Sequence, residues 1–263
     1  MYPADVLVAG RLVAAVGQGL TGAREVVDLD GAYVTPGLID GHVHLESSLV
    51  TPAAYAEVVV PRGVTAVVCD PHEIANVAGE AGVAWLLETT AHLHLDVWVT
   101  VPSCVPSTDL ETAGAEFGLP EMTRLLGHPR VVGVAEIMSF PDVVAGVRAA
   151  LAKAALAAAH ALPAEGHAPA LSGRDLQAYL AAGIGSDHEA TTVAEGREKL
   201  RAGTFLMVRE GSVTRDLAAL LPLVDPRHGD RVGFVTDDRL PHDLLAEGGV
   251  DHVVRAAIAG GAD

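Results

Sequence analysis

The stretch PGLIDGHVHLESS, residues 36–48, contains the pattern that decides the fold: a short apolar run followed by two histidines separated by one residue. Residues 37–40 are predicted to form a strand, in which successive side chains alternate between the two sides. His42 and His44 therefore point to the same side, where both imidazoles can bind one metal ion. A lone pair of this spacing is weak evidence, so the rest of the chain has to support it.

The residues that follow alternate short apolar runs with longer helical stretches, which is typical of strand–helix units around a parallel sheet. Seven further strands are predicted, in residues 64–69, 95–101, 131–135, 161–164, 182–185, 205–208 and 232–235. Among the helices, one over residues 172–182 begins at the N-cap Ser172, and one over residues 253–259 ends before Gly260. Eight such units predict a closed (β/α)8 barrel of the TIM type, for which 263 residues are enough.

Residues 1–36 have a different pattern, with short strands between glycine turns in residues 6–8, 12–16 and 26–29. We expect them to form part of a small N-terminal β-sandwich domain. The fold class is thus α/β, with a metal-dependent hydrolase barrel over residues 37–263.

Composition and charge narrow the function classes. The net charge of −17 argues against nucleic-acid binding, which depends on Lys and Arg, and favours a small neutral or cationic substrate. Cys69 and Cys104 are far apart in the sequence, so neither a disulfide framework nor a thiolate zinc site is expected. Without the pattern of a signal peptide or a membrane span, the expected location is the cytoplasm, with no membrane role.

Four further residues of metal-ligand type follow later apolar runs: Glu136, His167, His188 and Asp237. Barrel enzymes place their active sites at the carboxyl ends of the strands, so we expect these residues to gather with His42 and His44. Imidazole and carboxylate ligands suit iron, manganese or zinc, and a bridging carboxylate lets two cations share one site. Glu136 is placed for that bridge, because a carboxylate that ends a buried strand needs compensating charge.

Alternatives remain open for several of these residues. His167 and His188 are also compatible with loop histidines that hydrogen-bond to the backbone. Of Asp237 and Asp238, one would bind metal and move protons while the other orients the substrate or Arg239, and the sequence leaves the assignment open. A second histidine pair, at positions 92 and 94, precedes its strand, which favours a structural or surface role at the opposite end of the barrel.

Two motifs identify the family that the chain resembles. Residues 36–48, quoted above, and DPHEIANV, residues 70–77, together resemble the adenine deaminase family of the amidohydrolase superfamily. Members of the superfamily combine a first-strand His-x-His, later histidines and an aspartate after the eighth strand. Shorter matches are VPSCVP (101–106), GHAP (166–169), SDHE (186–189), REGS (209–212) and TDDR (236–239).

The resemblance implies an enzyme of purine metabolism that hydrolyses adenine to hypoxanthine and ammonia with a metal-activated hydroxide. It implies six metal ligands: His42, His44, Glu136, His167, His188 and Asp237. The cofactor would be a divalent metal, two Mn²⁺ or Fe²⁺ ions rather than Zn²⁺. Asp237 and Glu136 would be catalytic, with Asp237 moving the proton of the water, and His72, Glu73 and Asp238 are the substrate-binding candidates. Family analogy also implies a homo-oligomer.

The sequence also bears on other chemistries and on a non-catalytic role. The only lysines, Lys153 and Lys199, lie in predicted helices, which argues against a carboxylated lysine as the metal bridge. The paired-cysteine zinc site of cytidine deaminases is absent. Hydrolysis of another cyclic amidine or amide remains an alternative. So does an incompetent metal-binding fragment, because family members have a longer N-terminal β-segment and a C-terminal region after the eighth-strand aspartate that we expect to be missing.

Overall fold

The computed structural model describes residues 2–108 and 110–262 and divides the chain into two compact units, Met1–Pro36 and Gly37–Asp263. The first unit contains an antiparallel hairpin of β1 (Asp5–Ala9) and β2 (Leu12–Gly17), which confirms two of its three predicted strands. The third prediction, over residues 26–29, is wrong: these residues form no strand, and Val26 is 82% exposed. An apolar run becomes a strand only where another strand pairs with it, and the small β-sandwich stays a prediction.

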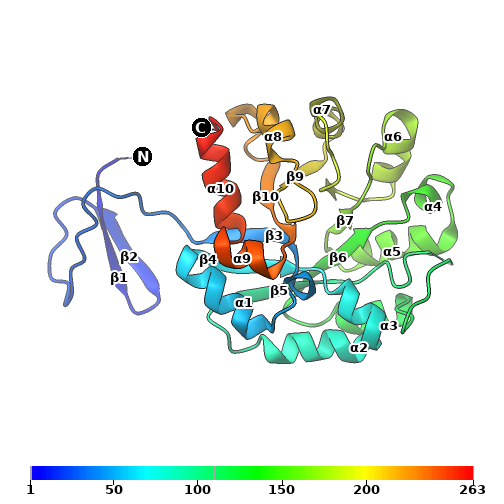
Figure 1. Ribbon diagram of the computed structural model, residues 1–263, viewed down its shortest axis with the longest axis horizontal. Helices are drawn as coiled ribbons and strands as arrows, with labels where there is room; N and C mark the ends of the chain where they lie inside the picture. The colour runs from blue at the N-terminus through cyan, green and yellow to red at the C-terminus, as the bar shows by residue number, and fades with distance from the viewer. Residues whose placement is uncertain (1, 109, 263) are drawn as a thin grey trace. The chain divides into compact units, whose positions relative to one another are not determined.

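The second unit is built on parallel strands, coloured from blue to orange in Figure 1. They are β3 (Leu38–His44), β4 (Val64–Cys69), β5 (Asp96–Val101), β6 (Val131–Ile137), β7 (Ala164–Gly166), β8 (Ser186–Asp187), β9 (Phe205–Arg209), β10 (Val232–Val235) and β11 (Asp237–Asp238). One sheet has the order β11-β3-β4-β5-β6-β7, and the other has the order β10-β9-β8.

Two connections close these sheets into a ring. A parallel bridge between Ala164 and Ile184 joins β7 to the segment before β8. On the other side, β11 follows β10 after one residue and pairs with β3, so that Asp237 lies opposite Val43. Counting β10 and β11 as one interrupted strand, eight strands surround the axis, and the predicted (β/α)8 barrel is confirmed.

Helices follow the strands and lie around them (Figure 1). They are α1 (Pro52–Val59), α2 (His72–Thr89), α3 (Leu119–Leu125), α4 (Phe140–Val144), α5 (Arg148–Ala159), α6 (Gly173–Ala181), α7 (Val193–Arg201), α8 (Leu217–Leu220), α9 (Pro241–Ala246) and α10 (Val250–Ala259). Single 3₁₀ turns are η1 (Leu45–Ser48), η2 (Val60–Arg62), η3 (Leu221–Leu223) and η4 (Pro226–His228). In the part of the chain that the structure describes, no helix combines the length and the apolar character needed to cross a membrane.

Local signals explain where the predicted boundaries succeed and fail. Helix α6 begins after the N-cap Ser172, as predicted, and α10 ends before Gly260 but begins earlier than expected, at Val250. The strands predicted at 161–164 and 182–185 lie further along the chain, as β7 and β8. Ala161 has a left-handed φ of 54° and closes α5, while Gly183 with a φ of 94° closes α6, so these residues end helices instead of starting strands.

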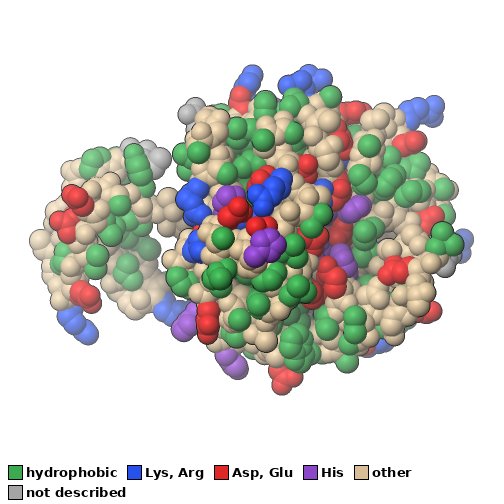
Figure 2. Space-filling model, in the orientation of Figure 1, with side chains coloured by type: hydrophobic (Ala, Val, Ile, Leu, Met, Phe, Trp, Pro, Cys, Tyr) green, Lys and Arg blue, Asp and Glu red, His purple; other side chains and the backbone are tan. Residues whose placement is uncertain are grey.

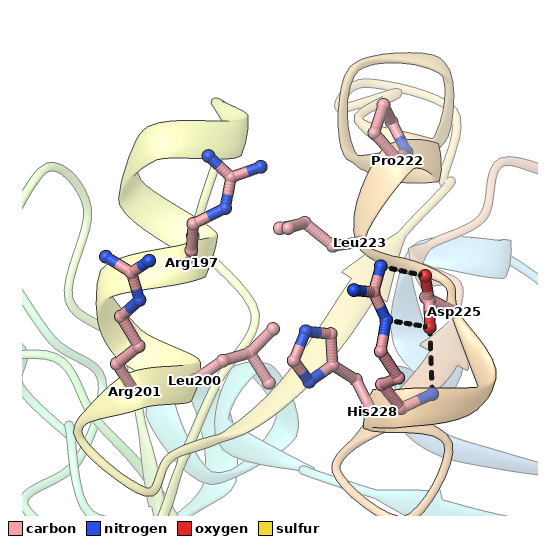
Figure 3. Close-up of a pocket in the computed structure, with 8 residues that line it drawn as sticks. Arg197, Leu200, Arg201, Pro222, Leu223, Asp225 and His228 are labelled. Atoms are coloured by element: carbon pink, nitrogen blue, oxygen red, sulfur yellow. Dashed lines mark hydrogen bonds and ion pairs between the residues drawn. The ribbon is translucent and has the colours of Figure 1, made fainter.

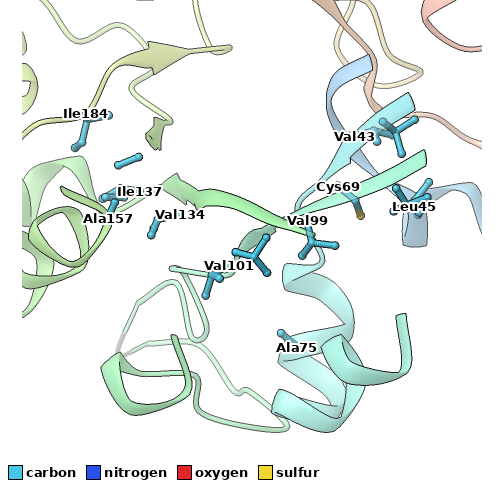
Figure 4. Packing of buried hydrophobic residues seen from close by; sticks show 14 of the residues in the cluster. Val43, Leu45, Cys69, Ala75, Val99, Val101, Val134, Ile137, Ala157 and Ile184 are labelled. Atoms are coloured by element: carbon cyan, nitrogen blue, oxygen red, sulfur yellow. The ribbon is translucent and has the colours of Figure 1, made fainter. Parts of the chain in front are cut away.

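The core fills the barrel and the layer between its strands and helices. Figure 4 shows Val43 of β3, Val99 of β5 and Val134 of β6, all fully buried, and Ala75 of α2 and Ala157 of α5 on the helix side. Burying one valine side chain stabilises the fold by roughly 1.5–3 kcal/mol. Because these parallel strands are covered on both faces, they read as continuous apolar runs, which is why the sequence signal for them is strong.

Candidate metal centre

Strand β3 carries His42 and His44 at its carboxyl end, and both side chains are almost completely buried. The strand is longer than predicted and includes both histidines, so their spacing of two places the rings near each other, with centroids 4.9 Å apart. By contrast, His92 and His94 are exposed before the start of β5, in agreement with the prediction of a surface position.

The structure brings together all six side chains predicted to bind metal. His44 Nε2 lies 3.0 Å from Asp237 Oδ1 and 3.6 Å from Glu136 Oε1. The other carboxylate oxygen of Glu136, Oε2, lies 2.5 Å from His167 Nδ1 and 3.3 Å from His188 Nε2. Each oxygen of Glu136 thus faces different histidines, which is the arrangement that a carboxylate shared by two cations requires. The role of the six residues as ligands stays a prediction.

The donor atoms around His42 fit a metal ion. Neither ring nitrogen has a hydrogen-bond partner among the described residues, although the side chain is only 1% exposed. Leaving a buried polar group unsatisfied costs about 1–3 kcal/mol. Carboxylate oxygens of Glu165 and Asp237 lie 3.6 Å from the two nitrogens. Two groups of three donor atoms include His42, and within each group the atoms lie within 4.8 Å of one another. One group is His42, Glu136 and His188, and the other is His42, His44 and Asp237. Imidazole nitrogens and carboxylate oxygens are the ligands of Mn²⁺, Fe²⁺ and Zn²⁺.

The carboxylates and imidazoles of the cluster shift each other's pKa values. Burial disfavours the charged form of Asp237, but the neighbouring imidazoles of His42 and His44 outweigh it and hold the pKa of Asp237 below its usual value. Burial and a hydrogen bond with His167 oppose each other in the same way at Glu136, whose pKa is also lowered. Burial alone would lower the pKa of His44, yet the bond with Asp237 raises it to about 10. The carboxylates and imidazoles therefore stabilise each other's charged forms.

The predicted substrate-binding residues lie at the edge of this cluster. His72 begins α2, and its Nδ1 lies 2.9 Å from Asp70 Oδ2 and 3.4 Å from Glu136 Oε1. Glu73 Oε2 lies 3.6 Å from His44 Nδ1, and Asp238 accepts a hydrogen bond from the Ser47 hydroxyl. The side chains of His72 and Glu73 are 20% and 37% exposed, unlike the buried histidines of β3.

Arg209 is a site residue that the sequence analysis missed. It ends β9, where its guanidinium group contacts Glu189 and donates to Asp237 Oδ2 at 2.9 Å. The hypothesis that Asp237 or Asp238 orients Arg239 is wrong. Arg239 donates instead to Gly248 O at 2.8 Å and to Oε2 of Glu247, the C-cap residue of α9, at 2.6 Å. The position of Arg209 at a strand end, shared with the other site residues, was the available signal.

The surface of the barrel unit includes a hollow with acidic and histidine side chains, and two cavities. Figure 2 shows acidic and histidine side chains gathered in a hollow of the barrel unit. A cavity of about 470 Å³ is lined by residues that include Ser103, Ile137 and Lys153, and none of its lining residues is a predicted site residue. A second cavity of about 290 Å³ is lined by Arg197 of α7, His228 and their neighbours, and none of its lining residues is a predicted site residue (Figure 3).

Comparison with known proteins identifies the family. The model of the Amidohydrolase family matches residues 33–258. The chain is 48% identical over 259 residues to adenine deaminase 2 of Carboxydothermus hydrogenoformans and 48% identical over 258 residues to the adenine deaminase of Cereibacter sphaeroides. In both cases the match covers 98% of this chain and 45% of the relative, so the chain spans less than half the length of these curated relatives.

Among solved structures, 5-methylcytosine deaminase from Klebsiella pneumoniae superposes with a TM-score of 0.64 at 14% identity, over 97% of this chain and 77% of that one. At this identity the likeness shows the barrel fold alone. The family model covers most of the chain, and relatives with nearly half of their residues identical cover almost all of it. The chain therefore belongs to the amidohydrolase family.

Proposed function

We propose that the protein hydrolyses adenine to hypoxanthine and ammonia. One observation carries the proposal: six ligand-type side chains, Glu136 among them, gather in one cluster in a chain that is 48% identical, over 98% of its length, to an adenine deaminase. The reaction replaces the amino group on C6 of the purine by the oxygen of water. Such a substrate is small and neutral, which suits the strongly negative chain.

The residues that would hold the metal are His42, His44, Glu136, His167, His188 and Asp237. A bound divalent cation acidifies water and stabilises the negative charge that develops in the transition state. We propose two ions, supported by the two oxygens of Glu136, which face His44 on one side and His167 with His188 on the other. Nitrogen and oxygen donors suit Mn²⁺, Fe²⁺ and Zn²⁺, and the resemblance to adenine deaminases supports Mn²⁺ or Fe²⁺ among them.

Asp237 is the proposed general base and acid. Arg209 holds its Oδ2, while Oδ1 faces His42 and His44. In this position it can accept a proton from the attacking water and deliver it to the departing amino group, so that the C6–N bond breaks as ammonia leaves. A positioned acid–base residue contributes about 10²- to 10⁴-fold to the rate.

His72, Glu73 and Asp238 are the proposed contacts to the base. Carboxylates accept hydrogen bonds from purine N–H groups, and a histidine donates to ring nitrogens. Their place at the partly exposed edge of the cluster supports this role.

A cytoplasmic location and a homo-oligomer belong to the same proposal. Two free, buried cysteines in the described residues support a reducing compartment. The homo-oligomer rests on family analogy.

A substrate panel tests the proposed function. The chain is reconstituted with Mn²⁺ or Fe²⁺, and ammonia release is measured with adenine, with other aminopurines and with hydantoin-like rings. The proposal expects the highest kcat/KM for adenine and hypoxanthine as the product. A higher kcat/KM for another ring would replace adenine as the substrate, whereas bound metal without turnover of any ring would favour the non-catalytic alternative.

A further inference from the structure

Lys199 is a fully buried cation that the proposed mechanism does not use. It lies on α7, and its side chain is 0% exposed. Burying an ammonium group is unfavourable unless it is paired and all of its N–H donors are satisfied. Its Nζ donates to Ala168 O at 2.7 Å, to Asp187 Oδ2 at 2.8 Å and to Glu195 Oε1 at 2.7 Å. All three donors of the ammonium are therefore used.

The partners of Lys199 bind two backbone segments. Asp187 accepts from the backbone N–H of Ala168 at 2.9 Å and from those of Glu189 and Ala190 at 3.1 Å each. Both backbone groups of Ala168 are thus held, its N–H by Asp187 and its carbonyl by Lys199.

Glu195 extends the same network along the two segments. It accepts from the backbone N–H of Ala170 at 2.8 Å and from that of Thr191 at 3.2 Å. We call Asp187, Glu195 and Lys199 the α7 triad. Through it, the segments at residues 168–170 and 189–191 are fastened to each other and to α7.

These segments directly follow His167 and His188, the two predicted ligands that strand pairing supports least. Strands β7 and β8 have three and two residues, and an isolated bridge joins Ala164 of β7 to Ile184, which precedes β8. Both histidines lie beyond the last residue of their strand. His42 and His44, by contrast, lie inside the seven residues of β3. The triad therefore supplies, through side chains, the restraint that the backbone ladder gives to the histidines of β3.

We propose that the α7 triad is a positioning device that holds His167 and His188 at the separation needed to bind metal. Their ring centroids lie 5.3 Å apart, and both face Glu136 Oε2. The inference rests on the metal centre of the proposed function. Lys199 acts through the backbone and is not a catalytic residue.

Metal titration of the apo chain tests this inference. In Lys199→Met the charge is removed and the length of the side chain is kept. Co²⁺ binding is followed by its visible absorption spectrum, which reports the ligands, and folding is followed by circular dichroism. We expect Co²⁺ affinity to fall about tenfold or more, the usual effect of removing a residue that orients metal ligands, together with an altered spectrum. Asp187→Asn carries the same expectation and serves if Lys199→Met does not fold.

Arg130→Met is the matched control. Arg130 precedes β6 at the other end of the barrel, and its guanidinium donates to Thr90 Oγ1 at 2.7 Å and to Val97 O at 3.3 Å. It should lower the melting temperature and leave Co²⁺ affinity unchanged. Wild-type affinity and spectrum in both triad variants would overturn the positioning role and leave the metal centre standing. Failure of the wild-type chain to bind Co²⁺ would overturn the metal centre itself, and this inference with it.

Discussion

Thr236 donates its hydroxyl to Asp40 Oδ2 at 2.5 Å and its backbone N–H to Asp40 Oδ1 at 3.1 Å. The two residues stand on either side of the seam where the barrel closes, one on β3 and the other between β10 and β11. Asp237, the next residue, has a left-handed φ of 58°. This bond therefore fixes both the closure of the ring and the place of the proposed general base.

Replacing Asp40 should destabilise the barrel. Asp40→Ala leaves the N–H and hydroxyl groups of Thr236 buried without their acceptor, so the free energy of unfolding should fall by about 1–3 kcal/mol. Thr236→Val removes the hydroxyl and keeps the N–H bond, and should cost less. Urea unfolding of the three chains measures the difference. Equal stability of Asp40→Ala and the wild type would show that the seam does not depend on this bond.

Replacing Asp237 should abolish turnover without emptying the metal centre. Asp237→Asn keeps the shape of the side chain but cannot accept a proton, so kcat should fall about 10²- to 10⁴-fold while part of the metal is retained. Asp238→Asn is the control, since Asp238 is a proposed substrate contact and should mainly raise KM. Steady-state kinetics and metal analysis on the same samples make the comparison. An unchanged kcat in Asp237→Asn would refute its role as base.

Replacing Glu136 should change the metal content. Glu136→Gln removes the charge that faces His44, His167 and His188, so the metal-to-chain ratio should fall below that of the wild type. Glu165 lies near only one of the predicted metal ligands, His42, so Glu165→Gln should reduce the metal-to-chain ratio less than Glu136→Gln. Elemental analysis after dialysis gives both ratios. A full complement of metal in Glu136→Gln would exclude it as the shared ligand.

Metal should stabilise the folded chain. A cation that binds the native state only adds about 2.7 kcal/mol at a concentration 100 times its Kd. Thermal unfolding in Mn²⁺ and in chelator should therefore give a higher melting temperature with the metal, and His42→Ala should lose most of this difference. Identical melting curves with and without Mn²⁺ would contradict a metal centre built from these residues.

The sequence could predict the barrel because its strands are strong, continuous signals. The strands at residues 64–69 and 232–235 match β4 and β10 residue for residue. Strands β7 and β8 were misplaced because they have only three and two residues and follow apolar helix ends, of which Ala161 is one. Residues 26–29 carry an apolar run without a partner, so propensity alone gave the wrong answer there.

The candidate ligands could be predicted because the carboxyl ends of parallel strands meet at one end of a barrel, whatever the helices do. The residues that surround and support these ligands could not be predicted. Arg209, Lys199 and Asp40 matter through partners that are 20 or more residues away or on another element, such as Glu189, Ala168 and Thr236. Those pairings depend on how helices pack against strands, and no local pattern encodes them.

The most direct test measures bound metal and ammonia release from adenine on one sample of the purified chain reconstituted with Mn²⁺ or Fe²⁺. We predict two ions per chain and stoichiometric formation of hypoxanthine and ammonia, both lost on treatment with chelator. A folded chain that binds no metal and releases no ammonia would contradict the central claim that these strand ends form a metal-dependent deaminase site.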